Sequence, residues 1–534
     1  MSPSRGALVA GAVVAATVTL AACDSSGTAH RNGAETSRSS TASSPSASPT
    51  PSPTRSYPLS KAPRTIPAVR EHTAARGPGW RPGKDSAVVI ADGSKGLADE
   101  GRLLAGELKI GYRGETPARA GDVELALTPK AGGGAESYTL RTHDGRVTIS
   151  GPGQAGVFYG TRTLKQSVRA DGTMPEGEVR DRPGKPQRGL NLDIARKHYS
   201  AGWIEDRLRE MADLKLNQLG LHFSDDQAFR IESDTHPEVV SPDHLTKAQV
   251  RRIVALAGRL HIEVVPEIDS PGHLGAVLRA HPDLQLRNVS GVPSTGSLDI
   301  SKPGAAKIVD ELLGEYTKLF GGAYWHLGAD EYLALMARDP AASYPQLQRA
   351  AVQKYGAGAG IKDLTTGWLN DRAAVVRPHG MKPKAWNDGF FRGGVVKADK
   401  DIEVEYWTGK EFGARPPQEY LSEGRRVMNL NDEFLYYVLG QPNTFVYPTG
   451  KRIYEQWTPL VLRGTTPVPA RYSDQILGGR FAVWGDLPNA QTAAQVAQGI
   501  RMPLRATAQK LWVPGKPKLS WNGFTALAKE IDAG

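Results

Sequence analysis

The chain has 534 residues and a formal net charge of +10, a length that suits two or three folded domains. Its positive charge is spread along the sequence with no long Lys/Arg run, so the sequence does not predict a nucleic-acid-binding protein, although affinity for anionic cell-wall polymers stays open. A single cysteine excludes intramolecular disulfides and thiolate metal sites.

The N-terminal residues have the pattern of a secretion signal. Arg5 precedes an apolar run over residues 7–20, which is too short to span a bilayer but suits the core of a signal peptide. The run leads into Leu20-Ala-Ala-Cys23, and Cys23 is the only cysteine. A stray thiol in a cleaved leader is one interpretation. The position favours the other, a resemblance to the lipobox of bacterial lipoproteins, which implies a signal peptide over residues 1–22, lipidation of Cys23 and anchoring to the outer face of the cell membrane.

Residues 23–64 are mostly Ser, Thr, Pro and Gly, with almost no large apolar side chain. Such a segment cannot bury enough surface to fold, so it is predicted to be a flexible or partly extended linker. Its natural role is a tether between the lipid and the folded part of the protein.

Residues 65–182 alternate between short strands and helices. Strand-like segments lie at 87–90, 123–127, 137–140 and 147–149, and helical patterns lie at 100–110 and 157–168. This mixture predicts a small α+β domain whose sheet is covered on one face.

Gly151, Gly153 and Gly156 match the G-x-G-x-x-G pattern of dinucleotide-binding proteins, between a strand and a helix. However, the turn at residues 143–146 is typical of a hairpin, so the preceding strands are expected to be antiparallel rather than part of a βαβ unit. No second buried strand ending in an acid follows the helix. We therefore interpret the glycines as a connection and not as a nucleotide site.

From residue 183 to residue 534, strand-like and helical segments alternate. The eight strand-like segments are 189–194, 218–224, 263–268, 324–327, 384–387, 403–407, 426–430 and 480–484. Helical patterns fill the gaps between them, at 203–214, 247–260, 305–319, 367–376 and 493–511. The alternation predicts an α/β fold, a (β/α)₈ TIM barrel with insertions, preceded by the small α+β domain.

Asp330 and Glu331 follow the fourth of these strands. Asp-Glu pairs also occur at residues 99–100, 310–311 and 432–433, where solvated surface is the simpler interpretation. Here the preceding residues are apolar, and Gly328-Ala329 remove bulk just before the acids. The carboxyl ends of barrel strands are where such folds place their chemistry, so this pair is the best candidate for a catalytic site.

Taken together, the strand ends carry acids, one arginine, one histidine and several aromatic residues. In chain order they are Asp193, Arg196, Asp225, Asp226, Glu267, Asp269, His273, Asp330, Glu331, Trp386, Asp388, Trp407, Tyr436, Trp484 and Asp486. Aromatic rings stack on the C–H faces of sugars, and charged groups bind hydroxyls, so the set predicts a sugar pocket. Tryptophans in the core, a turn histidine and helix-capping aspartates are the simpler alternatives.

These residues also match motifs of a known family. The matching stretches are residues 188–196, 215–217, 221–227, 266–273 and, most specifically, His326-Leu-Gly-Ala-Asp-Glu331. On them the chain resembles glycoside hydrolase family 20, the β-N-acetylhexosaminidases. Residues 138–140 and 156–164 resemble the small domain that precedes this family's barrel, so the resemblance covers nearly everything after the linker.

The resemblance implies an exo-acting, retaining enzyme that uses the substrate itself as nucleophile. Glu331 would then be the general acid and later the base. Asp330 would hold the 2-acetamido group while its carbonyl oxygen attacks the anomeric carbon and forms an oxazolinium intermediate. A neutral Glu331 requires a raised pKa, which we expect from the neighbouring Asp330 charge and an apolar wall.

The resemblance also assigns roles around the two acids. Arg196 would bind the sugar hydroxyls, and Asp225 with His273 would support the site. Tyr436 would donate a hydrogen bond to the acetamide carbonyl. Three rings would enclose the substrate, those of Trp386, Trp407 and Trp484.

Two positions depart from the family pattern. Val438 stands where the family commonly has an acid or amide, and Trp484-Gly-Asp486 stands where it has Trp-x-Glu. Both family positions contact the far hydroxyls of the terminal sugar. The preference between gluco and galacto sugars therefore stays open, with Asp486 the remaining candidate contact.

Two other functions stay open. One is a carbohydrate-binding or surface protein on an inactive barrel, which the presence of both acids disfavours. The other is a metal-dependent barrel hydrolase with Glu267, Asp269, His273 and Asp330 as ligands, although the first strand lacks a His-x-His pair.

The leading interpretation, a β-N-acetylhexosaminidase, needs no cofactor or metal. Its substrates are glycans with a terminal β-N-acetylhexosamine, such as chitin oligosaccharides and cell-wall or host glycans.

Overall fold

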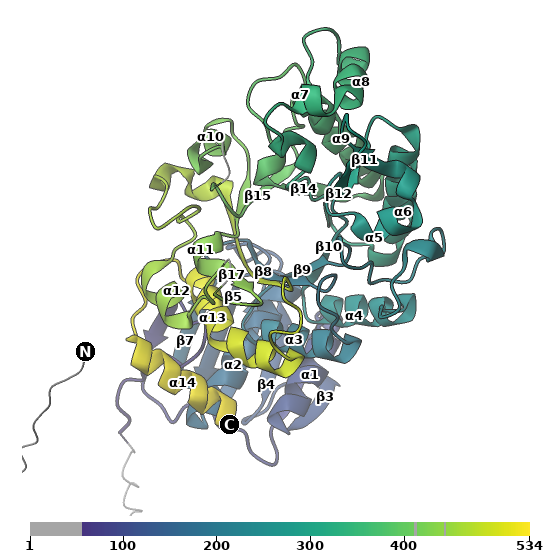
Figure 1. The fold of residues 1–534 in the computed structure, drawn as a ribbon. Coiled ribbons are helices and arrows are strands. Elements are labelled where there is room, and N and C mark those ends of the chain that lie inside the picture. The colour runs from purple at the N-terminus through teal and green to yellow at the C-terminus, as the bar shows by residue number, and fades with distance from the viewer. Residues whose placement is uncertain (1–55, 411–413, 443–444) are drawn as a thin grey trace, which may run out of the picture. The chain divides into compact units, whose positions relative to one another are not determined.

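The computed structural model describes residues 56–410, 414–442 and 445–534 (Figure 1). The predicted signal peptide, the lipidation site Cys23 and most of the predicted linker lie outside the described residues. Among the described residues, no helix has the length and apolar character needed to cross a bilayer.

The last residues of the predicted linker contact the folded part of the chain. Ser60 Oγ donates to the backbone carbonyl of Glu176 at 2.6 Å. Arg64 pairs with Asp171 at 2.8 Å and also with Glu530. Residues 60–64 are therefore attached to folded elements in the structure.

The small domain is a seven-stranded mixed sheet in the order β1-β7-β5-β6-β4-β2-β3. Its strands are β1 (Glu71–Ala74), β2 (Ala87–Ile90), β3 (Gly111–Glu115), β4 (Val123–Leu127), β5 (Tyr138–His143), β6 (Arg146–Gly151) and β7 (Gly177–Asp181). Helices α1 (Ala98–Leu108) and α2 (Gln154–Asp171) pack on it. Buried and more exposed residues alternate along β5, so one face meets the helices and the other faces outward, as predicted.

The glycine-rich segment before α2 is a close-packed connection. Strands β5 and β6 pair antiparallel, which confirms the hairpin predicted before the glycines. A Cβ on Gly156 would lie 2.0 Å from the Ser137 carbonyl oxygen. Glycine at this position therefore lets the start of α2 approach the backbone just before β5.

The second region is a closed parallel barrel. Its strands are β8 (Gln187–Asp193), β9 (Gln218–His222), β10 (Glu263–Glu267), β13 (Tyr324–His326), β14 (Lys382–Trp386), β15 (Glu403–Tyr406), β16 (Val427–Asn429) and β18 (Ile476–Trp484). Each strand pairs with the next, and β18 pairs with both β16 and β8 to close the ring. All eight predicted strands are confirmed, and β17 (Tyr436–Val438) adds a short strand beside the end of β18.

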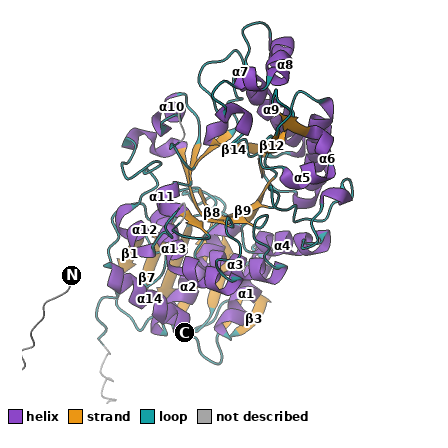
Figure 2. Cartoon of the chain, in the orientation of Figure 1, coloured by secondary structure: helices purple, strands orange, loops and turns teal. Residues whose placement is uncertain are grey.

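Helices surround the barrel (Figure 2). The longer ones are α3 (Ala201–Asp213), α4 (Lys247–Arg259), α6 (Pro303–Phe320), α8 (Pro345–Tyr355), α9 (Ile361–Val376) and α13 (Ala493–Trp512). The C-terminal helix α14 (Trp521–Ala533) packs mainly on α2 of the small domain. Thr246 and Thr492 precede α4 and α13 and form capping boxes. In each box the threonine hydroxyl accepts the backbone N–H of a glutamine, and the glutamine side chain accepts the backbone N–H of the threonine. The five helices predicted for this region are confirmed.

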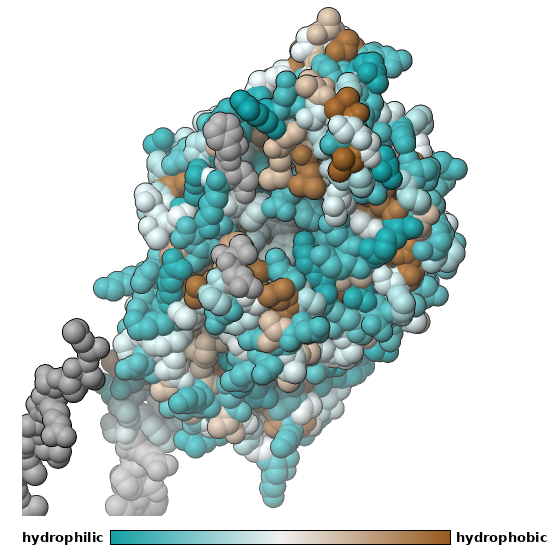
Figure 3. All heavy atoms as spheres, viewed as in Figure 1, coloured by the Kyte–Doolittle hydropathy of each residue, from teal (hydrophilic) through white to brown (hydrophobic). Residues whose placement is uncertain are grey.

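Shorter elements occupy the loops between barrel strands and helices. They are η2 (Pro237–Val239), α5 (Gly275–Ala280), η3 (Pro282–Leu284), β11 (Gln285–Arg287), β12 (Pro293–Leu298), η4 (Leu333–Met336), α7 (Pro340–Ser343), η5 (Arg377–His379), η6 (Asn387–Gly389), α10 (Pro417–Ser422), α11 (Asp432–Leu435), α12 (Gly450–Gln456) and η7 (Ala470–Gln475). On the face shown in Figure 3 the surface is mainly hydrophilic, with apolar residues in scattered patches.

Basic residues of two sequence motifs join the small domain to the barrel. Arg188 donates through both terminal nitrogens to Glu136 at 2.9 and 3.0 Å, and Asn217 donates to the same carboxylate at 3.0 Å. Lys215 is fully buried beside Asp181, and burial lowers the pKa of Lys215 to about 8. These motif residues lie at the amino ends of their strands and hold the domains together, away from the strand ends that carry the candidate site.

Candidate active site

The turn after β13 presents the two adjacent acids. Gly328, Ala329 and Glu331 have positive φ values of 70°, 81° and 47°. A Cβ on Gly328 would lie 1.6 Å from Asp269 Oδ1, so only glycine fits where the turn passes this carboxylate. The result is a largely buried Asp330, whose side chain is 15% exposed, beside Glu331, whose side chain is 41% exposed.

Asp330 lies in a cluster with Asp269 and His273, and their potential ligand atoms all lie within 4.8 Å of one another. Asp269 Oδ1 accepts a hydrogen bond from the Ala329 backbone at 2.9 Å, which ties the cluster to the turn. Burial raises the pKa of Asp330. Burial and the neighbouring Asp330 charge raise the pKa of Asp269 further above its ordinary range. This buried pair therefore holds a proton more readily than ordinary aspartates do.

His273 connects this pair to Glu331. Its Nε2 lies 3.7 Å from Asp330 Oδ2 and 3.5 Å from Glu331 Oε2, while its Nδ1 lies 3.4 Å from Asp225 Oδ1. Burial opposes the charged imidazole, but the charges of Asp330 and Asp269 outweigh it and raise the pKa of His273 well above its usual value. His273 therefore favours its charged form, and its Nε2 faces both catalytic candidates.

The expectation of a raised pKa for Glu331 is wrong for this arrangement. The interaction with His273, whose Nε2 lies 3.5 Å from Glu331 Oε2, lowers the pKa of Glu331, and burial opposes this effect only in part. The raised pKa belongs instead to Asp330 next to it. The reason is positional: Glu331 is half-exposed and directly faces the histidine, whereas Asp330 is buried among other acids.

Arg196 is held by the same Asp225 that contacts His273, but through its other oxygen, Oδ2. Its terminal nitrogens pair with Asp225 at 2.7 Å and with Asp193 at 3.1 Å, and its guanidinium lies 5.5 Å from the centre of the Trp484 ring system. Asp225 also accepts from His222 Nε2 at 2.8 Å. Burial works against the charge of Asp225, but the bonds from His222, His273 and Arg196 keep its pKa well below the ordinary value.

Aromatic rings form the other wall of the site. Tyr436 stacks on Trp407 with ring centres 5.7 Å apart and an interplanar angle of 5°. Trp484 lies 5.7 Å from Tyr436 and 5.9 Å from Trp386. Trp386 donates from Nε1 to Glu267 at 2.8 Å, which fixes its ring. The structure thus brings together all four aromatic residues selected from the sequence.

Asp388 joins the aromatic wall to the acid turn, a role that strand-end position alone did not indicate. One of its oxygens accepts from Trp407 Nε1 at 3.1 Å, and the other accepts from the Glu331 backbone N–H at 3.0 Å. The position of Glu331 is therefore coupled to the orientation of Trp407. A shared carboxylate of this kind has no signal in the sequence beyond its place after the strand.

The two departures from the family pattern lie at the edge of the aromatic wall. Val438 is buried in one apolar cluster with Trp386 and Tyr436, and it pairs with Trp484 along the sheet. Asp486 is exposed, and its charge helps to raise the pKa of Arg196. The side chain of Val438 thus offers no hydrogen bond, and Asp486 keeps its carboxylate near Arg196.

Beneath the site lies a buried polar layer that the sequence did not reveal as a unit. His222 lies between Asp225 and Glu267, at 2.8 and 3.1 Å, and although burial opposes its charge, the pKa of His222 is raised to about 10 by these carboxylates. His326 lies 3.4 Å from Glu267, and Arg480 binds Glu405 in bidentate fashion. Both histidines lie in the recognised motifs, but only the closed barrel shows that their side chains point into its interior.

Of the four ligands considered for a metal-dependent hydrolase, three come together. Asp269, His273 and Asp330 form a compact group, but Glu267 is held in the polar layer by His222 and Trp386. The raised pKa of His273 means that a cation would compete with a proton there. The geometry thus offers an incomplete version of the site that a metal-dependent mechanism requires.

Comparisons with known proteins agree over both domains. The profile of the glycosyl hydrolase family 20 catalytic domain matches residues 186–514, and that of domain 2 of the same family matches residues 62–182. A lacto-N-biosidase of Bifidobacterium bifidum is 32% identical over 87% of this chain and 41% of its own length. A beta-hexosaminidase of Porphyromonas gingivalis is 29% identical over 84% of this chain and 58% of its own.

Solved structures support the fold. The family 20 exo-β-N-acetylglucosaminidase of Vibrio harveyi, in complex with N-acetylglucosamine, aligns with a TM-score of 0.72 at 20% identity, covering 91% of this chain and 79% of that one. The chain spans about half the length of the two curated relatives above, at 41% and 58%.

Proposed function

The chain belongs to glycosyl hydrolase family 20, and from that premise we propose that it is an exo-acting β-N-acetylhexosaminidase, which removes terminal β-linked N-acetylhexosamine. One observation carries the proposal. The largely buried Asp330 and the half-exposed Glu331 stand side by side in the turn after β13, and Asp388 links this turn to the aromatic wall of Trp386, Trp407, Tyr436 and Trp484.

The adjacent acids favour a mechanism in which the substrate supplies the nucleophile. A retaining enzyme with its own nucleophile needs two carboxyl groups about 5 Å apart on opposite sides of the scissile bond, and family 20 is an exception to that scheme. Neighbouring residues on one turn are poorly placed for it. In the proposed step the acetamide carbonyl oxygen forms a bond to the anomeric carbon as the bond to the leaving oxygen breaks, and Glu331 transfers its proton to that oxygen.

The second half of the proposed reaction returns the enzyme to its starting state. Glu331 takes a proton from a water molecule that attacks the anomeric carbon and opens the oxazolinium ring, which restores the acetamide with overall retention. Asp330 holds the acetamide N–H throughout and compensates the positive charge of the ring. Tyr436 donates to the acetamide oxygen, and the three tryptophans exclude other water.

Arg196 is the proposed contact for the sugar hydroxyls. Two buried aspartates and the face of Trp484 hold its guanidinium in place, so little freedom is lost when it binds a substrate. Asp225 supports both Arg196 and His273, which couples hydroxyl binding to the charge next to Glu331.

The test of this function uses aryl glycosides and purified protein. We expect release of nitrophenol from the β-N-acetylglucosaminide and not from the β-glucoside, because the latter has no acetamide to act as nucleophile. An inactive carbohydrate-binding barrel would release neither. Equal hydrolysis of both would exclude substrate assistance.

A second candidate is the release of a disaccharide that ends in N-acetylhexosamine. The buried, apolar Val438 makes no hydrogen bond with a terminal hydroxyl, and the 32% identical relative is named a lacto-N-biosidase. An aryl disaccharide whose aryl-linked unit is N-acetylglucosamine separates the two. Release of the intact disaccharide favours this candidate, and release only from the aryl monosaccharide favours the first.

We also propose that Cys23 is lipidated and that the mature protein is anchored to the outer face of the cell membrane. Support comes from the sequence alone, in the apolar run and the Leu20-Ala-Ala-Cys23 junction. Cells producing the full chain should incorporate labelled fatty acid into it and retain it in the membrane fraction. The Cys23→Ser variant should lose the label, and label retained by that variant would exclude this anchor.

A further inference from the structure

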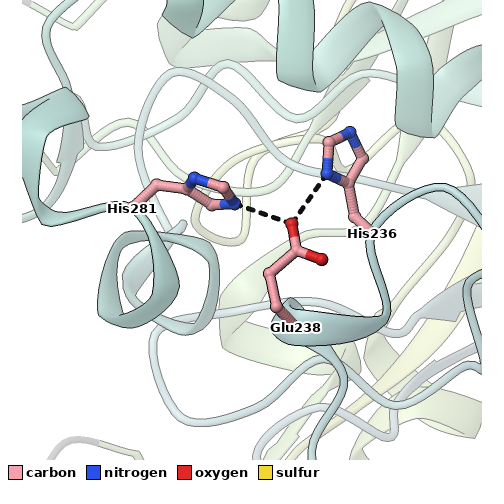
Figure 4. Close-up of side chains that lie close together, drawn as sticks. All are labelled: His236, Glu238 and His281. Carbon is pink, nitrogen blue, oxygen red and sulfur yellow. Dashed lines mark hydrogen bonds and ion pairs between the residues drawn. The ribbon is translucent and has the colours of Figure 1, made fainter.

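His236, Glu238 and His281 form a compact group away from the catalytic candidates (Figure 4). His236 Nδ1 and His281 Nε2 both lie 2.9 Å from the same atom, Glu238 Oε1. The side chains are 14%, 43% and 28% exposed in chain order, so the group is open to solvent on one side. Two imidazole nitrogens thus converge on one carboxylate oxygen, from the segment at the start of η2 and from the end of α5, and the three ligand atoms lie within 4.8 Å of one another.

Glu311 of helix α6 binds the other nitrogen of His236. Its Oε2 lies 3.1 Å from His236 Nε2. When Nε2 carries the proton and donates it to Glu311, Nδ1 has a lone pair that faces the Glu238 carboxylate. A carboxylate on the far nitrogen is also the usual partner of a metal-binding histidine.

We propose that His236, Glu238 and His281 form a binding site for a divalent transition-metal ion, with Zn²⁺ as the best fit. Two imidazoles and one carboxylate are a ligand set that zinc accepts, with water in the fourth position of a tetrahedron. Ca²⁺ and Mg²⁺ prefer oxygen ligands and fit less well. At zinc–ligand distances of about 2.0–2.1 Å, tetrahedral ligand atoms lie about 3.3 Å apart, so each imidazole nitrogen needs to move only a few tenths of an ångström away from Glu238 Oε1.

The site would join the loops that carry two residues of the candidate active site. Segment η2 belongs to the chain between β9 and α4, which also contains Asp225. Helix α5 begins two residues after His273, and His281 follows its last residue. The start of α5 is already held to the first loop, because the Gly275 N–H donates to Asp226 Oδ1 at 2.9 Å. A metal ion would fix the far end of α5 to the same loop.

Zinc binding to the full-length purified protein tests the site, after chelator treatment and dialysis. We expect one Zn²⁺ per chain by elemental analysis and calorimetry. His281→Ala should weaken binding at least 100-fold, and Glu311→Gln, which leaves all three ligands in place, should weaken it about 10- to 100-fold. His379→Ala, which removes an exposed histidine elsewhere, should bind as the unmodified protein does.

Thermal unfolding tests the proposed role of the site in joining the loops. Zn²⁺ at about 100 times its dissociation constant should raise the Tm by about 3 °C, and this rise should vanish in His281→Ala. Absence of stoichiometric binding, or equal binding by His281→Ala and the unmodified chain, overturns the site. Binding without a rise in Tm overturns its stabilising role. Neither readout depends on glycosidase activity.

Discussion

The mouth of the barrel has two unlike halves. The ends of β8, β9, β10 and β13 carry a connected set of charges, in which Asp225 binds Arg196, His222 and His273, and His273 lies beside both catalytic candidates. The ends of β14, β15, β17 and β18 carry packed aromatic rings with few charges. The first half can set protonation states, and the second can set shape and exclude water.

This division has a consequence for mutations. Charges in the first half act on one another through a buried network, so removing one changes the pKa of the others and the effects will not add. Rings in the second half act mainly through contact and hydrogen bonds. Asp388 is the link between the halves, because it binds both Trp407 and the backbone of Glu331.

The largest effect should come from Glu331→Gln, which keeps the shape but removes the proposed proton donor. We expect a loss of about 10²–10⁴-fold in kcat/KM on substrates with poor leaving groups. Aryl substrates with acidic leaving groups should lose less, because these groups depart without protonation. Equal losses on both substrate types would argue against the role of general acid.

Asp330→Asn should cost about 10²–10³-fold in kcat, because the acetamide loses both orientation and charge compensation. A thiazoline that mimics the cyclised intermediate should inhibit the unmodified enzyme and bind this variant far more weakly. Trapping of a covalent glycosyl-enzyme, or failure of the thiazoline to inhibit the unmodified enzyme, would exclude the substrate-assisted route.

Tyr436→Phe tests the aromatic half, since it keeps the ring on Trp407 and removes one hydroxyl donor. We expect a loss of about 10²-fold in kcat if this hydroxyl binds the acetamide oxygen. Tyr437→Phe is the matched control. Its ring stacks on Tyr447 and its hydroxyl binds Gln491 at 3.0 Å, so kcat should be unchanged. Similar losses in both variants would point to a general disturbance of β17.

His273→Gln should move the pH profile. The histidine, whose Nε2 lies 3.5 Å from Glu331 Oε2, lowers the pKa of Glu331. Removing the positive charge should therefore let the Glu331 pKa rise, so the acid stays protonated to higher pH. The alkaline limb of the kcat/KM profile should shift to higher pH, whereas His379→Gln should leave it in place. A shift to lower pH would contradict this assignment.

The smallest effect concerns sugar preference, at the edge of the aromatic half. Val438 offers no hydrogen bond, and Asp486 is one methylene shorter than the family's glutamate. We expect discrimination between β-linked N-acetylglucosamine and N-acetylgalactosamine within about tenfold, or about 1.4 kcal/mol. Asp486→Glu should sharpen the preference. A hundredfold preference in the unmodified enzyme would show that other residues recognise the hydroxyl.

Local sequence patterns were sufficient for much of the molecule. Strand and helix periodicity predicted the eight barrel strands in order, and the carboxyl end of each strand marked the residues that meet at the mouth. The hairpin turn at residues 143–146 correctly predicted antiparallel β5 and β6. These features depend on neighbours along the chain and on a topology that directs every strand end to one side.

Only the tertiary structure decided which groups lie close enough to change one another's charge. The tertiary structure raised the pKa of Asp330 instead of that of Glu331. It also placed Glu267 in the polar layer, and it assigned Arg188 and Lys215 to the domain interface. It also brought His281 to His236 and Glu238 from a different loop. Coulombic and desolvation effects depend on distance and burial in space, and neither quantity can be obtained from the spacing of residues along the chain.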